Sequence, residues 1–399
     1  MNDTKKFYYS FIILAALELL ARSPFPLPAA TYIYAATIYY LLFQVYLYIR
    51  HNTAYIRRNY DGIGWILAFA VCNAIMVVRG FLNSDSYWHY KNVFINTGPS
   101  LFVFLFIFLS KEVSLCNRML KFILKYYLLA SALLIHNSSI ANTGRIMCNT
   151  IPVLAYFTKK YRWIIILFVL YSLTMTWGAR GWVLRALFGL GLGCTTLLFK
   201  HMVKKMIPIY KAVFFVFLIS PLVLSYLGYK GTFNVFNMES YVKSSNLKED
   251  DIVDTRTFLY ILVQSKLEKE NAVLAGVGVG VSYWDDFNQD TGISEVDKLG
   301  RTSTESALLN NYFWGGLIGA FLFSMLFWIS AYYGIFKSKN NICKLTGVFI
   351  MFRWVISFVD EPNAWVCSNM LMFFFMGLCL NRQVRNMDDS YIKNYFKIS

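Results

Sequence analysis

The chain has 399 residues, of which 57% are hydrophobic and only 15% are charged, and its mean hydropathy is +0.47. Soluble globular domains carry roughly 25% charged residues, so this composition excludes a water-soluble protein and indicates that much of the surface faces lipid. Aromatic residues make up 18% of the chain, which suits transmembrane helices that end in aromatic belts.

The formal net charge of +16 is unevenly distributed along the chain. Residues 229–306 hold eight Lys/Arg and thirteen Asp/Glu, a net charge of −5, which leaves +21 for the rest. This basic excess falls in short clusters between apolar runs, so it indicates membrane topology and argues against nucleic-acid binding. The seven Cys form no C-x-x-C pair, and no Cys or His lies in 229–306. We therefore expect no disulfide framework, no metal site and no cofactor.

Apolar runs long enough to suggest membrane spans follow one another along the chain. They lie at 7–21, 27–49, 63–82, 93–110, 122–136, 140–158, 163–179, 182–199, 207–228, 311–335, 345–359 and 363–381. The predicted fold is an all-α polytopic membrane protein with about 12 transmembrane helices. Residues 1–228 would hold helices 1–9, residues 229–306 one large periplasmic loop, and residues 307–399 helices 10–12 and a cytoplasmic tail.

Lys/Arg clusters occupy alternate connections between these runs. They lie at 5–6, 50–58, 111–125, 159–162, 200–211, 337–344 and 382–397, whereas the opposite connections are short or hold single arginines, namely Arg22, Arg79, Arg145 and Arg180. The positive-inside rule then places both termini in the cytoplasm and the acidic loop outside. The first run resembles a signal peptide, but Glu18 interrupts it and no A-x-A site follows, which favours a retained helix.

Two segments of the large loop have a recognisable pattern. Residues 255–270 carry apolar side chains at helical spacing, which predicts an amphipathic helix lying on the membrane or over the bundle. Gly276-x-Gly278-x-Gly280 lacks a following Lys-Ser/Thr and any strand context, so we interpret it as a tight turn rather than a nucleotide-binding loop.

Among the arginines at or inside the predicted spans, Arg180, Arg185 and Arg353 are candidate functional residues. An arginine at a helix centre costs roughly 2.5–3.5 kcal/mol on insertion scales, and chains usually keep one only with a partner or a task. Arg180 lies in an outer turn, where snorkelling to the interface explains it equally well. Arg185 lies one turn deeper, which favours a functional role. Arg353 lies within its run, where an ion pair with Asp360 or Glu361 is as plausible as substrate binding.

Three other residues are candidates. Arg256 opens the predicted loop helix, where a solvated helix face would also explain it. Glu305 could belong to a Thr302-x-x-Glu305 capping box, in which the carboxylate reaches back to a backbone N–H, or to an active site. His136 near an outer helix end is a weak acid/base candidate.

From residue 140 to residue 335 the chain resembles the bacterial O-antigen polymerase (Wzy) and O-antigen ligase superfamily. An outer Arg180-Gly181 turn opens a Gly-rich helix, a long outer loop starts at Arg256-Thr-Phe-Leu-Tyr and reaches Gly276-Val-Gly278, and Thr304-Glu305-Ser306-Ala-Leu-Leu runs into Gly316-Leu-Ile-Gly319. The last segment is similar to the H-N-x-x-L … G-L-I-G segment of the family. Glu305 stands where ligases commonly have His, which favours a polymerase over a ligase.

The resemblance implies a GT-C-like membrane glycosyltransferase that joins undecaprenyl-pyrophosphate-linked oligosaccharide units at the outer face of the inner membrane. The implied catalytic residues are Glu305 as base, with Arg180 and Arg256 stabilising the pyrophosphate charge without metal. Implied substrate-binding candidates are Arg185, Arg353, Arg301, Arg145, Tyr283 and Trp284. Implied partners are the lipid-linked oligosaccharide, the lipid bilayer and a chain-length regulator protein. No nucleic-acid partner is expected.

Three alternatives remain open on the sequence. An O-antigen ligase belongs to the same superfamily, but the missing His counts against it. A flippase or other transporter of the lipid-linked unit fits the number of spans, yet it has little use for a long outer loop. A purely structural membrane protein is disfavoured by the arginines inside the spans.

Overall fold

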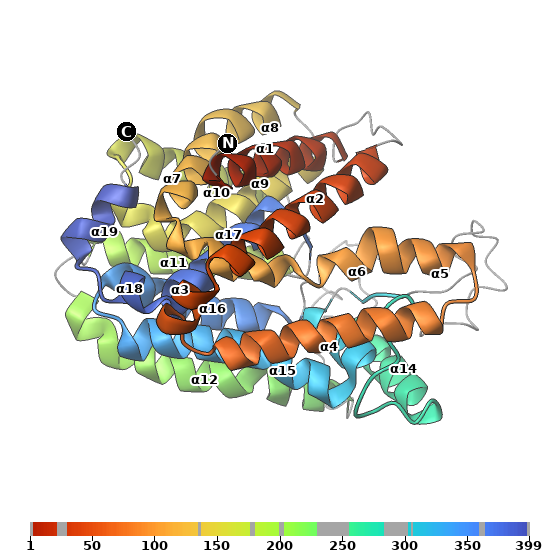
Figure 1. The fold of residues 1–399 in the computed structure, drawn as a ribbon. Coiled ribbons are helices and arrows are strands. Elements are labelled where there is room, and N and C mark those ends of the chain that lie inside the picture. The colour runs from red at the N-terminus through yellow and green to blue at the C-terminus, as the bar shows by residue number, and fades with distance from the viewer. Residues whose placement is uncertain are drawn as a thin grey trace, which may run out of the picture.

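The computed structural model describes residues 3–21, 30–134, 137–175, 180–198, 203–229, 255–282, 302–304, 306–358 and 364–396. Over these residues the protein is helical and contains no strand (Figure 1). The α-helices are α1 Asp3–Ala21, α2 Ala30–His51, α3 Thr53–Asn59, α4 Ile63–Leu82, α5 Tyr87–Lys91, α6 Thr97–Ser100, α7 Val113–Phe122, α8 Leu128–Leu134, α9 Asn137–Thr150, α10 Lys159–Met175, α11 Arg180–Leu198, α12 Val203–Tyr229, α14 Thr255–Lys269, α15 Ala307–Lys337, α16 Asn341–Ile356, α17 Cys367–Leu380, α18 Arg382–Arg385 and α19 Asp389–Phe396. The π-helical segments are η1 Asn92–Asn96 and η3 Ile123–Tyr127, and the 3₁₀ segments are η2 Val103–Lys111 and η4 Ile151–Tyr156.

The structure confirms an all-α membrane protein. Five helical segments within the described residues are long and apolar enough to span a bilayer, namely Ala30–His51, Ile63–Leu82, Tyr87–Lys111, Lys205–Leu224 and Ala307–Lys337. The total of about twelve spans stays a prediction. The 14-residue helix α17 shows why apolar runs overcount lipid-facing spans, because every one of its residues is buried by protein.

Apolar side chains on the outside of the bundle identify the lipid-facing surface. Leu67, Val71, Ile75 and Val78 recur at helical spacing on α4, and each is more than half exposed. Helix α12 likewise exposes Phe215, Val216, Ile219 and Tyr226. A continuous apolar surface of this kind is stable in a bilayer and unfavourable in water.

The predicted run 93–110 is not a regular helix. It consists of η1, α6 and η2, and Pro99 lies inside it and lacks a backbone N–H. Two of its carbonyl groups are bonded by side chains from elsewhere in the bundle. Trp365 Nε1, just before α17, donates to Pro99 O at 2.8 Å, and Asn73 Nδ2 of α4 donates to Leu101 O at 2.8 Å. The irregular backbone is therefore tolerated because it is buried in protein.

Helix α15 is broken at Gly316, whose φ of 64° and ψ of −160° are not helical. We call residues 272–280 the strap, because this segment repairs the break. The N–H groups of Val277 and Gly278 bond the carbonyls of Phe313 and Trp314, and the N–H groups of Leu317 and Ile318 bond the carbonyls of Val273 and Leu274. The four backbone groups that would have paired within a continuous α15 thus all pair with the strap.

The strap also resolves the two predictions made for the large loop. Gly276, Gly278 and Gly280 have φ values of 66°, 90° and 87°, so the prediction of a tight glycine turn is confirmed. Helix α14 forms as predicted, and Leu259, Val263 and Leu267 on one of its faces are buried in a cluster with residues of α4 and α15. The helix was predicted to lie either on the membrane or over the bundle, and it lies over the bundle.

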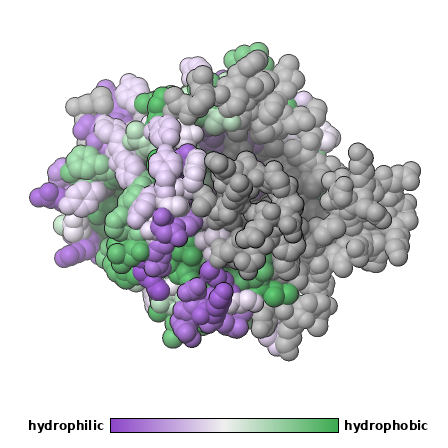
Figure 2. Space-filling model, turned by 90° about the vertical axis from the view of Figure 1, so that its right-hand side faces the viewer, coloured by the Kyte–Doolittle hydropathy of each residue, from purple (hydrophilic) through white to green (hydrophobic). Residues whose placement is uncertain are grey.

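The predicted basic connections meet at one end of the bundle, with α3, α18 and α19 (Figure 1). Contacts there join Lys111 Nζ to Asn52 Oδ1 at 2.7 Å, Lys339 N to Arg385 O at 3.0 Å, Asn341 N to Asp389 Oδ1 at 2.7 Å, and the guanidinium of Arg118 to the ring of Tyr8 at 5.6 Å. Helices α5 and α14 lie at the opposite end (Figure 1). Figure 2 views that end, where the described residues include a group of hydrophilic ones. That the basic end faces the cytoplasm stays a prediction.

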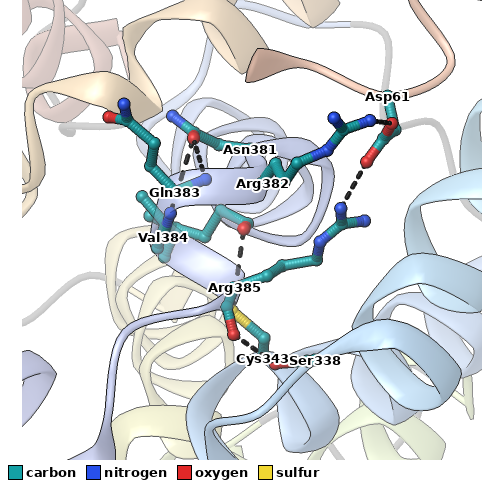
Figure 3. Close-up of polar contacts among 9 residues, drawn as sticks. Asp61, Ser338, Cys343, Asn381, Arg382, Gln383, Val384 and Arg385 are labelled. Atoms are coloured by element: carbon teal, nitrogen blue, oxygen red, sulfur yellow. Dashed lines mark hydrogen bonds and ion pairs between the residues drawn. The ribbon is translucent and has the colours of Figure 1, made fainter.

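Asp61 is the central charge of this basic end (Figure 3). Its carboxylate accepts a 2.7 Å hydrogen bond from Arg382 Nη2 and a second from Arg385 Nη2, which ties the α3–α4 turn to α18. The Arg385 side chain is 4% exposed and stacks on the ring of Tyr333 at 4.5 Å. Burial alone would raise the pKa of Asp61, but the hydrogen bonds and charges of the two arginines outweigh it and lower the pKa.

We expect Asp61→Asn to destabilise the protein by about 3–5 kcal/mol at neutral pH, because Arg385 would keep a buried charge without its counterion. In the wild type, the lowered pKa of Asp61 stabilises the fold at pH values above 3.8, the ordinary pKa of an aspartate. This contribution is lost as the pH falls through the pKa that Asp61 has in the folded protein. Thermal unfolding in detergent at pH 7 and under acidic conditions measures both effects. Asp388→Asn, an exposed neighbour at the same end, is the control. Equal melting temperatures for the two variants would contradict the expectation.

Candidate functional site

A polar helix lies inside the bundle. Helix α9 was predicted as part of the apolar run 140–158, but its side chains Asn142, Thr143, Asn149 and Thr150 are polar and buried. It contacts α10, α11 and α17. Polar groups buried in a membrane protein cost free energy unless they are hydrogen-bonded, and they commonly mark functional positions. Helix α9 is therefore the centre of the candidate site.

Two of the predicted arginines converge on α9. Arg185 of α11 is 3% exposed and Arg353 of α16 is 2% exposed. Helix α11 packs against α9 and α16, and α16 also packs against η4, the segment that continues from α9. Next to them, the rings of Phe188 and Phe352 stack with centroids 3.9 Å apart and planes 9° apart, which fastens α11 to α16. The structure thus gathers two cations from distant parts of the sequence in one buried region.

The surroundings of Arg353 are only partly those expected. Its Nε donates to the Met372 sulfur of α17 at 3.3 Å, a weak acceptor that leaves the charge of the guanidinium uncompensated by that contact. The expected partners Asp360 and Glu361 lie outside the described residues, and α16 ends at Ile356, before either of them.

Arg145 does not lie in an outer connection, so that prediction is wrong. It lies in the second half of α9, with buried residues on either side of it in the sequence. Its side chain is partly exposed although its neighbours are buried. The physical reason for the error is that 122–158 contains two helices of different character, and the polar residues of α9 resemble a loop in a hydropathy profile.

Glu18 is a buried polar residue that was not among the predicted site residues. It is 4% exposed, and its Oε1 accepts from Asn142 Nδ2 at 2.6 Å. Its Oε2 accepts from the backbone N–H of Cys367 at 3.0 Å. An acidic residue inside an apolar run could have identified Glu18 from the sequence. There it was used only as evidence against a signal peptide. A carboxylate in a span is by default a functional candidate.

The chain segments next to Arg256, Glu305 and Arg353 meet at the end of the bundle where α14 lies. Ser306 Oγ donates to Ser357 O at 3.2 Å, and Tyr260 Oη donates to Phe358 O at 3.4 Å. Ser306 directly follows Glu305, Tyr260 lies one turn after Arg256, and Ser357 lies one turn after Arg353. The start of α15, the helix α14 and the end of α16 are therefore joined at one place.

The capping-box interpretation of Thr302 and Glu305 is wrong. Helix α15 begins at Ala307, and its N-cap is Ser306, whose Oγ accepts from Leu309 N at 3.2 Å. Thr302 precedes the helix and its carbonyl accepts from Trp314 Nε1 at 3.1 Å. A capping box needs the Ser/Thr at the N-cap itself, and Thr302 does not hold that position.

Several predicted residues remain without a described side chain. Arg180 begins α11 and Arg256 lies in the first turn of α14, but their side chains lie outside the described residues, as do Glu305, Arg301, Tyr283, Trp284 and His136 altogether. Their roles stay predictions. Among the described residues, no group of three or more His, Cys, Asp or Glu side chains could hold a metal ion.

The described part of the site contains two buried arginines, Arg185 and Arg353, and the buried carboxylate of Glu18. Guanidinium groups bind phosphate oxygens in bidentate fashion, and in a water-excluded interior such contacts are stronger than in water. The arrangement of Arg185, Arg353 and α9 therefore suits an anionic group more than a neutral one. No protein-family model, curated protein or solved structure matches the chain. The function is therefore argued from this geometry and from the motifs quoted above.

Proposed function

We propose that the protein is a membrane glycosyltransferase of the surface-polysaccharide polymerase type. It joins oligosaccharide repeat units linked to undecaprenyl pyrophosphate at the periplasmic face of the bacterial inner membrane. The observation that supports the proposal most is that Arg185 of α11 and Arg353 of α16 are both buried, on helices that pack against each other inside a membrane-embedded bundle. Buried cations are expensive, and a pyrophosphate leaving group is a ligand that requires them.

The proposed division of labour follows from the chemistry. The donor already carries its leaving group, so the enzyme has to stabilise the charge that develops on the pyrophosphate. Arg185 and Arg353, with Arg180 and Arg256, supply cations for this task. The acceptor hydroxyl needs a base to take its proton, and Glu305 is the proposed base. The junction of α14, α15 and α16 supports this assignment, because the chain segments next to Arg256, Glu305 and Arg353 meet there.

The position of α14 supports an outer reaction chamber rather than a transport path. Its apolar face packs on the bundle, and Tyr312 Oη of α15 donates to Gln264 Oε1 of α14 at 2.6 Å. The strap then returns from α14 into the break of α15. A cover anchored in this way suits an enzyme that keeps sugars at one face of the membrane.

The lipopolysaccharide of a deletion strain tests the proposal. Loss of a polymerase leaves core carrying a single repeat unit, whereas the wild type shows a ladder of longer chains. Core without any repeat would identify a ligase instead, and failure of labelled repeat units to reach the periplasm would identify a transporter. An unchanged ladder would refute all three.

A further inference from the structure

Glu18 stands in an apolar stretch of α1, and the proposed reaction leaves it without a role. Only 4% of the residue is exposed. An ionisable side chain at such a position persists when it has a partner or a task. Its contacts show what the task is.

The carboxylate of Glu18 joins three helices. Oε1 accepts from Asn142 Nδ2 of α9 at 2.6 Å, and Oε2 accepts from the N–H of Cys367, the first residue of α17, at 3.0 Å. The first N–H groups of a helix have no partner within the helix, and the Glu18 carboxylate provides an acceptor for the N–H of Cys367. Asn142 Nδ2 also lies 2.9 Å from Tyr127 Oη, which adds a hydroxyl to the cluster.

A second contact fastens α9 to the same turn of α17. Asn149 Nδ2 donates to the carbonyl of Ser368, the residue after Cys367. Asn142 and Asn149 are two turns apart on α9, so they lie on one face of the helix. Arg145 lies between them on that face, three residues from one and four from the other. On another side α9 packs against α11, the helix that carries Arg185.

We propose that Glu18 is a positioning residue for the proposed pyrophosphate-binding site. It holds α9 at a fixed height and rotation against α17, and so keeps Arg145 in register with Arg185 and Arg353. This inference rests on the proposed function. It assigns Glu18 a role through hydrogen bonds, not through proton transfer or charge.

Two substitutions separate these roles. Glu18→Ala removes both acceptor oxygens. Glu18→Gln removes the charge but keeps the hydrogen bonds, because Gln Oε1 still accepts from Cys367 N and a rotated Asn142 amide accepts from Gln Nε2. Such a rotation of a side-chain amide is a change in hydrogen-bond assignment only. Ser10→Ala, a buried polar residue of the same helix, is the matched control.

The experiment uses the full-length protein in lipid nanodiscs, with undecaprenyl diphosphate as the probe and hydrogen exchange of the α9 and α17 peptides as a further readout. We expect Glu18→Ala to weaken binding about tenfold, as small displacements of binding groups do, and to speed exchange at the start of α17, while Glu18→Gln and Ser10→Ala behave as wild type. Equal loss of binding in Glu18→Gln would overturn the inference, because charge would then be essential. Faster exchange with unchanged binding in Glu18→Ala would also overturn it, because the role would then be structural only.

Failure of the proposed function gives a different result. If the wild-type protein does not bind undecaprenyl diphosphate, the proposed substrate is wrong, and the inference falls in its present form. The exchange data then show whether Glu18 fastens α9 to α17 regardless of the ligand. Unchanged exchange in Glu18→Ala would overturn that part as well.

Discussion

Replacing Arg353 by methionine is expected to abolish the polysaccharide ladder while the protein stays folded. Removing a donor that stabilises developing charge typically costs about 100- to 1000-fold in rate. A buried charge kept only for structure behaves differently, because an apolar residue of similar volume in its place is often neutral or stabilising. The same result is expected for Arg185→Met, since Arg185 is also buried and its helix packs against that of Arg353.

Two control variants test whether the effect is specific to the guanidinium group of Arg353. Arg353→Lys keeps the charge and loses the planar fork that binds a phosphate bidentately, so we expect it to restore the ladder only in part. Arg57→Gln, an exposed arginine at the basic end, should leave the ladder unchanged. Lipopolysaccharide gels and thermal unfolding of the purified variants are the measurements. A normal ladder in Arg353→Met would show that Arg353 takes no part in the reaction.

Replacing Gly276 by alanine is expected to be the most destabilising change in the strap. Gly276 has a φ of 66°, and an added Cβ would lie 2.3 Å from the carbonyl carbon of Trp314, which is backbone and cannot rotate away. The chain would have to leave the break in α15, and the hydrogen bonds at Phe313 and Trp314 would be lost. We expect a loss of about 3 kcal/mol or more, as strained backbone positions and buried unpaired groups together imply.

A matched glycine provides the control for that measurement. Gly64 lies in α4, and an added Cβ there would meet nothing within 4 Å. Gly64→Ala should therefore be neutral or stabilise the protein by up to about 1 kcal/mol, the difference in helix propensity. Thermal unfolding of both variants in the same detergent decides the matter. If Gly276→Ala and Gly64→Ala have the same melting temperature, the strap does not stabilise α15 in the membrane-embedded protein.

Hydropathy predicted where helices occur, but it did not predict whether lipid or protein covers them. The run 63–82 coincides with α4, because that helix faces lipid along a stripe and protein along the other side. The run 363–381 contains α17, which is apolar because it is wholly enclosed by other helices. Lipid and protein interiors are both apolar, so composition alone does not distinguish a lipid-facing span from a central helix.

Composition and charge by themselves determined that the chain is a helical membrane protein, that the basic connections alternate, and that an amphipathic helix and a glycine turn lie in the large loop. These features are local, since each follows from a few neighbouring residues. Only the tertiary structure decided that the loop returns to repair α15, that Arg185 and Arg353 are buried on helices that pack together, and that Glu18 reaches the start of α17. Such contacts join residues that are distant in the sequence, 349 positions apart for Glu18 and Cys367. Their energies arise from burial and hydrogen bonding between helices, which no single segment encodes.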